Sequence, residues 1–238
     1  SEEGHFLVDG GGGSEILARL KRAGIDVNDI HHIFVTHKHI DHVMGIIWML
    51  RVICQNMNVG KYQGEAYIYA HQELTEMLRT LAEMLLNQKE TKLIGDRVHL
   101  VPVTDGEQKE ILGHRYTFFD IGSTKAKQYG YMCDLGDGRK LTCCGDEPYN
   151  DREEPYAAGS DWLLHEAFCL NGQADIFHPY EKHHSTVKDA CELAERLYVK
   201  NLVLYHTEDK NIARRQELYR AEGEQYFTGR LLIPEDMD

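Results

Sequence analysis

The stretch Phe34–His42, FVTHKHIDH, constrains the fold more than any other part of the chain. It combines four side chains of the types that bind metals: His37, His39, Asp41 and His42. The stretch overlaps a β-branched and aromatic segment, residues 31–36, and is followed by an apolar segment, residues 43–56. The first composition favours a strand, and we interpret the second segment as a mostly buried helix. The sequence therefore predicts a strand, a ligand-bearing loop and a helix in close succession.

The spacing of these side chains fits metal binding. In an extended segment, residues i and i+2 share a face, so His37 and His39 can reach one cation at about 2.0–2.1 Å. Asp41 and His42 are expected after a turn, facing a second cation, while the intervening residues point away. Two cations about 3.5–4 Å apart can clamp a phosphoryl or carbonyl oxygen. Imidazole and carboxylate ligands favour zinc, with manganese or iron as alternatives. The alternative is a cluster of solvated histidines. It agrees poorly with a stretch that follows a hydrophobic strand and precedes a buried helix.

The rest of the chain alternates strand-like and helix-like segments, which is typical of a layered α/β (α+β) protein with helices outside the sheets. No repeat or Pro/Ser-rich linker divides it, so we expect a single domain over residues 1–238. Ser14 is expected to cap the first helix, and Gly24 to end it. Helices are expected at residues 14–24, 43–56, 73–88, 185–199 and 210–223. Strands are expected at residues 5–10, 31–36, 65–70, 97–103, 109–113, 114–121, 129–135, 140–145, 161–167 and 201–206.

Four of the expected strands lead into a residue that can bind a metal or transfer a proton. These residues are His37, Asp146, Glu166 and His206. Loops at strand ends collect reactive groups on a rigid frame. Four such strand ends indicate a functional site more strongly than any one of them.

Composition excludes several classes of protein. The 238 residues are 42% hydrophobic, enough for a sizeable core. The apolar run VMGIIWML is far shorter than the ~20 residues of a membrane span. The first residues do not combine a basic region with an apolar stretch, so we expect no signal peptide. A net charge of −13 argues against a broad nucleic-acid surface. The six cysteines lack a C-x-x-C spacing, so we expect buried thiols in a reducing cytoplasm.

Five motifs resemble those of one family, in the family's order. THKHIDH resembles the signature of the metallo-β-lactamase superfamily, and CCGDE resembles its strand-end Gly-Asp motif. LLHEAF, KHHST and LVLYHTE resemble motifs of the ribonuclease Z-like phosphodiesterases. The resemblance runs from Phe6 to Thr207 and implies an αββα metallo-β-lactamase sandwich with two zinc ions.

The resemblance also implies a role for each matched residue. The first metal would take His37, His39 and Asp146. The second metal would take Asp41, His42, Asp146 and His206. Asp41 would also orient or deprotonate the attacking water.

Glu166 and His184 would deliver a proton to the leaving oxygen. A carboxylate beside an imidazole fixes its tautomer and makes it a competent general acid near neutral pH. The alternative is an ordinary surface ion pair.

The chain departs from the family pattern at three places. The resemblance expects a third histidine for the first metal where Gly122 stands, and His99 and His114 are the nearest replacements in sequence. The family's opening strand, before the equivalent of FLVDG, does not appear, so we expect residues to be missing upstream of Ser1. The tRNA-processing members of the family carry a long protruding arm before the bridging aspartate. In this chain, only about fifteen residues separate Tyr131 from Asp146, which leaves no room for such an arm.

The resemblance implies a metal-dependent phosphodiester hydrolase, in which a metal-bound hydroxide attacks phosphorus. Its substrate would be RNA, as in tRNA 3′-end processing by an endonuclease, or a smaller phosphodiester. Relatives are commonly homodimers, so we expect one here. One alternative is a thioester or lactone hydrolase. The other is an impaired member that binds a ligand without turning it over, because Gly122 cannot bind a metal.

Three further features give little evidence of a functional site. His31, His32 and His71 are expected to be structural or surface residues. GGGG at residues 10–13 lacks the form of a P-loop and is interpreted as a turn beneath the metal site. Lys182 and His183 could approach a phosphate, but one lysine is weak evidence.

Overall fold

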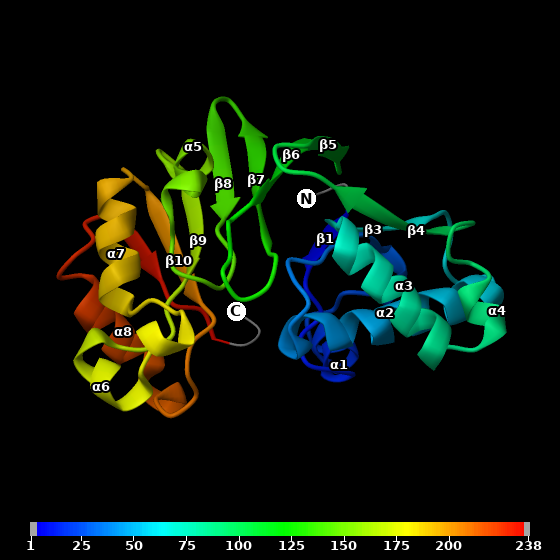
Figure 1. Cartoon of the computed structure of the whole chain (residues 1–238), viewed down its shortest axis with the longest axis horizontal. Helices are drawn as coiled ribbons and strands as arrows, with labels where there is room; N and C mark the ends of the chain where they lie inside the picture. Colours follow the sequence, from blue (N-terminus) through cyan, green and yellow to red (C-terminus); the bar gives the residue numbers. More distant parts are fainter. Residues whose placement is uncertain (1–3, 236–238) are drawn as a thin grey trace. The chain divides into compact units, whose positions relative to one another are not determined.

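The structure is a computed structural model that describes residues 4–235. Its backbone contacts divide the chain into two compact units (Figure 1). The first unit holds the described residues up to Gly113 together with Thr124–Tyr129. The second unit holds His114–Ser123 and the described residues from Gly130 onward. The single domain expected over residues 1–238 stays a prediction.

The first unit is built on a parallel sheet. Its strand order is β1-β2-β3-β4, with β1 at His5–Val8, β2 at Ile30–Phe34, β3 at Ala66–His71 and β4 at Val98–Val103. Parallel neighbours need long crossovers, and helices supply them here. The helices are α1 at Glu15–Arg22, α2 at Ile40–Asn58, α3 at Gln72–Leu85 and α4 at Gln88–Thr91.

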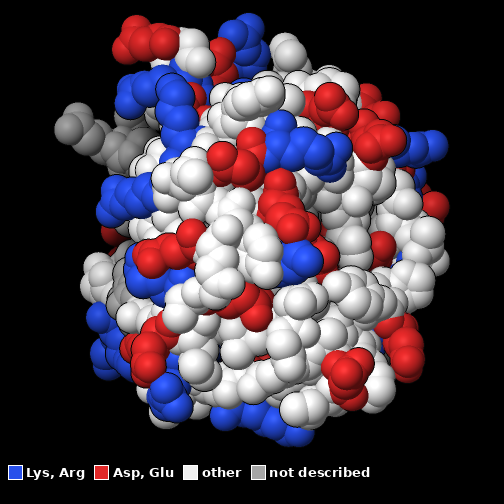
Figure 2. Space-filling model, turned by 90° about the vertical axis from the view of Figure 1, so that its left-hand side faces the viewer, with Lys and Arg blue, Asp and Glu red and all other residues white. Residues whose placement is uncertain are grey.

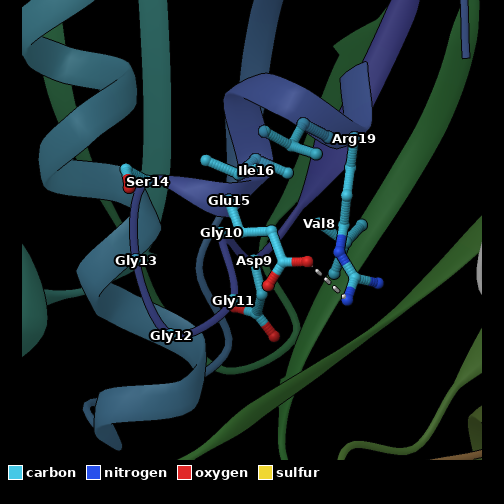
Figure 3. A pocket seen from close by; sticks show the side chains of 11 residues that line it. Val8, Asp9, Gly10, Gly11, Gly12, Gly13, Ser14, Glu15, Ile16 and Arg19 are labelled. Atoms are coloured by element: carbon cyan, nitrogen blue, oxygen red, sulfur yellow. Dashed lines mark hydrogen bonds and ion pairs between the residues drawn. The ribbon is translucent and has the colours of Figure 1, made fainter. Parts of the chain in front are cut away.

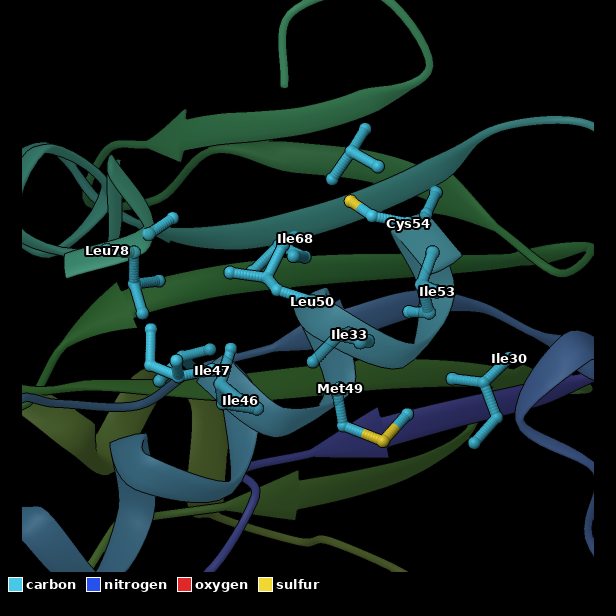
Figure 4. Packing of buried hydrophobic residues seen from close by; sticks show 14 of the residues in the cluster. Ile30, Ile33, Ile46, Ile47, Met49, Leu50, Ile53, Cys54, Ile68 and Leu78 are labelled. Carbon is cyan, nitrogen blue, oxygen red and sulfur yellow. The ribbon is translucent and has the colours of Figure 1, made fainter. Parts of the chain in front are cut away.

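Helix α2 forms the centre of the first unit's core, as its apolar sequence predicts. Met49, Leu50 and Ile53 are fully buried on α2, and they belong to one cluster with Ile33 and Ile68 of the sheet (Figure 4). Each fully buried aliphatic side chain stabilises the fold by about 1.5–3 kcal/mol. This packing fixes α2 and with it the ligand residues at its first turn.

The second unit is built on a mixed sheet. Its strands follow the order β11-β10-β9-β8-β7-β6, in which β7 and β8 are antiparallel and β8 to β11 are parallel. The strands are β6 at His114–Asp120, β7 at Tyr129–Gly136, β8 at Arg139–Cys143, β9 at Trp162–Glu166, β10 at Asn201–Tyr205 and β11 at Arg230–Leu232. A short strand, β5 at Gln108–Ile111, precedes β6. The helices are α5 at Glu154–Ala157, α6 at Ala174–Phe177, α7 at Val187–Arg196 and α8 at Arg215–Gly223.

Helix α7 begins where the sequence places a capping box. The Thr186 side chain accepts a hydrogen bond from the Asp189 backbone, and the Asp189 side chain accepts one from the Thr186 backbone. Val187, Ala190 and Cys191 on α7 are fully buried in the second unit's core. The cap fixes where the helix starts, just after His184.

The order of strands and helices is confirmed, and several boundaries are corrected. Helix α2 begins at Ile40, earlier than expected, because the extended His39 serves as its N-cap. The last helix begins at Arg215, later than expected, after a 3₁₀ turn at Ile212–Arg214. Four elements were not predicted from the sequence, namely β11, α4, α5 and α6, because they are too short to show a clear periodicity.

The two ends of α1 differ in how well they match the prediction. Ser14 stands at the N-cap position, but its side chain makes no capping hydrogen bond. Gly24 follows the helix with a φ of +73°, the left-handed conformation expected of a C-terminal glycine.

A tight hairpin occupies the segment where the resemblance would place an arm. Strands β7 and β8 are joined by Asp137 and Gly138, whose φ angles are +55° and +73°. Two successive left-handed residues of the type Asp-Gly make the turn that matches the twist of paired strands. The prediction that no long arm lies between Tyr131 and Asp146 is confirmed.

One prediction from composition is also confirmed. All six cysteines are buried free thiols. Within residues 4–235, no helix combines the length and apolar character that a membrane crossing requires.

Candidate functional site

The first two ligand-type histidines lie on one face of an extended segment. His37 is fully buried, and His39 is half-buried. His37 Nε2 lies 2.7 Å from His39 Nδ1, and the two rings meet nearly at right angles. Two ring nitrogens that point at each other can converge on a single cation. The geometry of this pair of histidines in the first unit therefore agrees with the prediction from their spacing.

Asp41 and His42 lie in the first turn of α2, rather than in a loop after a turn as expected. His42 is buried, and its Nε2 lies 3.6 Å from Asp41 Oδ2. The ring centres of His37 and His42 are 4.1 Å apart. The first unit thus brings the four ligand-type residues of the FVTHKHIDH stretch into one group.

Asp9 orients this group, although it was not among the site residues predicted from the sequence. Asp9 Oδ2 lies 2.8 Å from His42 Nδ1 and also accepts a hydrogen bond from the Thr36 hydroxyl. The same hydroxyl lies 2.9 Å from His37 Nδ1. Engaging the Nδ1 atoms leaves the Nε2 atoms of both histidines for a metal, which is how outer carboxylates fix ligand tautomers. The available signal was the place of Asp9 at the end of the strand FLVDG.

The glycine-rich loop holds Asp9 against α2. Gly10 donates a backbone hydrogen bond to His42 O, and Gly45 donates one to Gly11 O. A Cβ on Gly10 would lie 2.4 Å from Ile46 N, so a side chain cannot fit there. The loop runs from β1 to α1 and lines a cavity of about 670 Å³ (Figure 3). The prediction of a turn beneath the ligand stretch is confirmed.

In the second unit, Asp146 and His206 lie close together. His206 Nε2 is 3.6 Å from Asp146 Oδ2. Asp146 is buried just after β8, and His206 follows β10 with a left-handed φ of +54°. The Tyr205 hydroxyl donates a hydrogen bond to Gly145 O, which ties these two strand ends to each other. The prediction that both residues lie at strand ends is confirmed.

Glu166 and His184 also meet in the second unit. Glu166 is fully buried, and its Oε1 accepts a hydrogen bond from the Ser185 backbone. Its Oε2 lies 3.5 Å from His184 Nδ1, within ion-pair range but longer than a hydrogen bond. Because both groups are nine-tenths buried or more, they are not the surface ion pair of the alternative interpretation.

The surroundings of His184 place it next to His206. The ring centres of His184 and His206 are 5.1 Å apart. Phe168 stacks on His184 at 5.0 Å, and Lys182 Nζ lies 5.0 Å from the centre of the Phe168 ring. Lys182 therefore brings a positive charge towards the pair, which the sequence had indicated only weakly.

The backbone and the surroundings of Gly122 do not suit the histidine that the resemblance expects at this position. Its φ is +71°, and an added Cβ would lie 3.1 Å from Arg152 Cδ. His99 and His114 are engaged elsewhere, His99 with Glu65 at 3.1 Å and His114 with the Asp134 carbonyl at 3.2 Å. A restored histidine would be strained and would have to displace Arg152.

The other histidines weighed in the sequence have structural partners. His31 Nδ1 lies 2.9 Å from Glu65 O, and His32 Nδ1 lies 3.1 Å from the Tyr69 hydroxyl. His71 is buried at the end of β3, where it serves as the N-cap residue of α3. The positions of these three residues agree with the structural role that we expected.

A buried acid lies behind the strand end that carries Asp146. Glu153 is fully buried, and its Oε1 accepts a hydrogen bond from the Asn150 backbone. Burial raises the pKa of Glu153 to about 8 and holds the pKa of the neighbouring Cys144 thiol well above its usual range. Glu153 is therefore largely protonated at neutral pH.

The donor atoms suit a divalent metal. The first unit offers imidazole nitrogens and the Asp41 carboxylate, and the second offers the Asp146 carboxylate and the His206 imidazole. Zinc binds such nitrogen and oxygen donors at about 2.0–2.2 Å. The residue types therefore fit the metal expected from the sequence.

Comparison with known families gives one match that spans most of the chain. Residues 5–207 match the family described as Beta-lactamase superfamily domain. A ribonuclease Z of Thermococcus sibiricus is 24% identical over 269 residues, covering 95% of this chain and 84% of that protein. A ribonuclease Z of Thermobifida fusca is 25% identical over 275 residues, covering 99% of this chain and 85% of that protein.

Two solved structures share the fold. The metallo-β-lactamase fold protein YhfI from Bacillus subtilis has a TM-score of 0.79 at 18% identity, covering 99% of this chain and 87% of that one. Human tRNase Z, short form, has a TM-score of 0.72 at 20% identity, covering 100% of this chain and 88% of that one. At these identities, the likeness concerns the fold.

Proposed function

The chain belongs to the β-lactamase superfamily and has the metallo-β-lactamase fold predicted from its motifs, and from this premise we propose that it is a metal-dependent phosphodiester hydrolase resembling ribonuclease Z. Curated relatives named ribonuclease Z align over nearly the whole chain and most of their own length, which supports this choice within the superfamily.

The fold implies divalent metal binding, and we propose the ligand sets that the motifs imply. His37, His39 and Asp146 would hold the first metal. Asp41, His42, Asp146 and His206 would hold the second metal, with zinc as the proposed ion and manganese or iron as alternatives. Bound divalent cations activate water and stabilise charge on phosphoryl oxygens. Asp41, exposed at the start of α2, would orient or deprotonate the attacking water.

The observation that carries the proposal is the arrangement of Glu166 and His184, the pair proposed to supply a proton. Within the second unit, the ring of His184 lies 5.1 Å from that of His206 and within ion-pair range of the fully buried Glu166. Glu166 would hold His184 oriented, and His184 would donate a proton to the leaving oxygen. A thioester or lactone hydrolase has less need of such an acid, because a thiolate leaves readily and a lactone is reactive.

The test uses two substrates that differ in their leaving groups. The full-length protein with zinc or manganese should hydrolyse bis(p-nitrophenyl) phosphate and a short RNA. His184→Gln should lower RNA cleavage by about 10²–10⁴-fold, because a ribose oxygen needs protonation. It should affect the nitrophenyl ester far less, because p-nitrophenolate leaves without help.

His178→Gln is the matched control. This exposed histidine lies in the same segment and pairs with Glu181 at 3.5 Å. Its variant should keep the activity on both substrates. If the metal-loaded protein turns over neither phosphodiester but cleaves a thioester or lactone, the proposed function is wrong.

We propose RNA as the natural substrate, cleaved at a tRNA 3′ end. A smaller phosphodiester is the alternative substrate. Lysines and arginines alternate with aspartates and glutamates on the face drawn in Figure 2, without a continuous basic surface. Together with the net charge of −13, this pattern favours local recognition of the cleaved end. We therefore propose that the protein recognises a few nucleotides around the reacting bond.

The impaired-member alternative draws support from Gly122. It predicts fewer than about one metal per chain after reconstitution with zinc, whereas a hydrolase with both metals predicts about two. Metal analysis by mass spectrometry of the reconstituted protein distinguishes them.

We also propose a homodimer and a cytoplasmic location. Ile40 and Trp48 on α2 are exposed apolar side chains that a partner copy could cover. Sedimentation at several concentrations should give twice the mass of one chain, and a single-chain mass at all concentrations would exclude the dimer.

The cysteines support the proposed cytoplasmic location, because six buried thiols are typical of a reducing compartment.

A further inference from the structure

Arg215 is a buried positive charge outside the proposed metal site. It is the first residue of α8, and only 7% of its surface is exposed. Its Nη1 donates a hydrogen bond to the Thr207 hydroxyl at 2.6 Å. Within residues 4–235, no carboxylate forms an ion pair with it, and its buried Nε has no hydrogen-bond partner. A buried charge without a counter-ion is costly, so such a guanidinium indicates a place for an anion.

Arg215 lines a cavity that also reaches His206. The cavity has a volume of about 300 Å³, and Tyr205 and Thr207 contribute to its wall. It lies where β10 ends and α8 begins. The first backbone N–H groups of a helix and its dipole favour an anion at such a place, and a guanidinium can bind a phosphate through two parallel hydrogen bonds.

Two carboxylates modify what the cavity can accept. Asp209 and Glu235 also line it, and both are exposed, whereas Arg215 is buried. The exposed carboxylates disfavour a doubly charged anion and can accept hydrogen bonds from hydroxyl groups. A singly charged phosphodiester with its neighbouring ribose therefore fits better than a free phosphate dianion.

We propose that this cavity binds a phosphate group of the nucleic-acid substrate that flanks the reacting phosphodiester, with Arg215 as the residue that recognises it. The assignment of the flanking phosphate rests on the proposed function, because His206 belongs to the proposed metal site and also lines the cavity. The binding of a phosphate group by Arg215 does not depend on catalysis. Free phosphate is the other source of the same chemistry, and the experiment separates the two.

The first measurement is thermal unfolding of the full-length chain with increasing inorganic phosphate at mildly acidic pH, where the singly charged form predominates, with EDTA present throughout. Phosphate should raise the unfolding temperature of the wild type, because a ligand that binds only the folded state stabilises it. Arg215→Gln should abolish the rise. Arg214→Gln is the matched control, since Arg214 is exposed and paired with Glu217 at 2.8 Å. The rise should persist in that variant.

Thr207→Val is a second variant in case Arg215→Gln does not fold. It removes the hydroxyl that holds the guanidinium, and it should weaken the phosphate effect. A wild type without the rise, or a variant of Arg215 or Thr207 that keeps it in full, would overturn the proposal. A rise that depends on Arg215 in a protein without any hydrolytic activity would support the phosphate site while the proposed function fails.

The second measurement compares substrates with one and two phosphodiesters. With metal present, the wild type should have a KM about tenfold lower for a trinucleotide than for a dinucleotide, as expected for one charge-assisted contact. Arg215→Gln should remove this difference, and Arg214→Gln should keep it. If the variants respond as expected to phosphate but the two substrates have equal KM values in the wild type, the cavity takes free phosphate and the flanking-phosphate assignment is wrong.

Discussion

Asp9 lies outside every motif of the sequence, yet its carboxylate contacts both His42 and Thr36. Thr36 in turn contacts His37. One carboxylate at the end of β1 therefore sets the ring orientation of two proposed metal ligands. Such outer groups contribute to metal affinity without touching the metal.

Asp9→Asn should weaken zinc binding by about 10–100-fold, because the amide is a poorer partner for the His42 ring N–H than a carboxylate. A titration against a competing chelator measures this affinity. Asp96→Asn, at an exposed aspartate of the same unit, should leave it unchanged. Equal zinc affinity in Asp9→Asn and the wild type would show that Asp9 has no orienting role.

Glu153 should make stability depend on pH. Its pKa of about 8 in the folded protein lies above the ordinary range of a glutamate, so the folded state holds the proton more tightly than the unfolded chain. Its contribution is complete at acidic pH, below the unfolded pKa, and is lost as the pH rises towards 8. Between these limits, the loss is at most about 1.4 kcal/mol per pH unit.

Glu153→Gln should remove this slope, because glutamine does not ionise. Urea unfolding at pH 5.5 and pH 8 should show the variant gaining stability relative to the wild type as the pH rises. Glu154→Gln, at the exposed neighbouring glutamate, should follow the wild type. A constant difference between Glu153→Gln and the wild type at both pH values would contradict the raised pKa.

At the scale of elements, the strand-to-helix connections place the chemistry. Helix α2 starts directly after His39, so its first turn carries Asp41 and His42. The burial of Met49 and Leu50 fixes the rotation of α2. The ligand geometry therefore follows from how one apolar helix packs on its sheet.

The β7–β8 turn gives a prediction at this scale. Gly138→Ala should destabilise the protein by about 1–2 kcal/mol, because the residue has a left-handed φ of +73°. Gly172→Ala is the matched control, since its φ is not left-handed and a Cβ there would also meet nothing within 4 Å. It should be neutral or slightly stabilising. Urea unfolding compares the two, and equal effects would show that turn geometry is not the cause.

At the scale of the whole molecule, a hairpin lies between Tyr131 and Asp146, in the segment where the tRNA-processing members of the resembled family carry a long arm. A protein without that arm should gain little from the body of a tRNA. We expect similar kcat/KM values, within about tenfold, for a precursor tRNA and for a short RNA with the same 3′ end. Steady-state cleavage of both RNAs measures this ratio. A preference of a hundredfold or more for the tRNA would show that another surface recognises it.

The sequence by itself determined the family, the order of strands and helices and the ligand-type residues at strand ends. These features depend on local patterns: β-branched strands, an apolar helix and short motifs such as THKHIDH. Spacing alone was enough to place His37 and His39 on one face, because side chains alternate along any extended segment.

Only the tertiary structure revealed Asp9, Arg152 and Arg215. Asp9 meets His42 across 33 positions of the chain, and Arg152 lies beside Gly122. The burial of Arg215 without a carboxylate partner follows from how α8 packs at the end of β10. No periodicity or motif encodes such contacts, because they depend on how separate elements pack together. The sequence therefore shows which residues can carry the chemistry, and the fold decides what surrounds them.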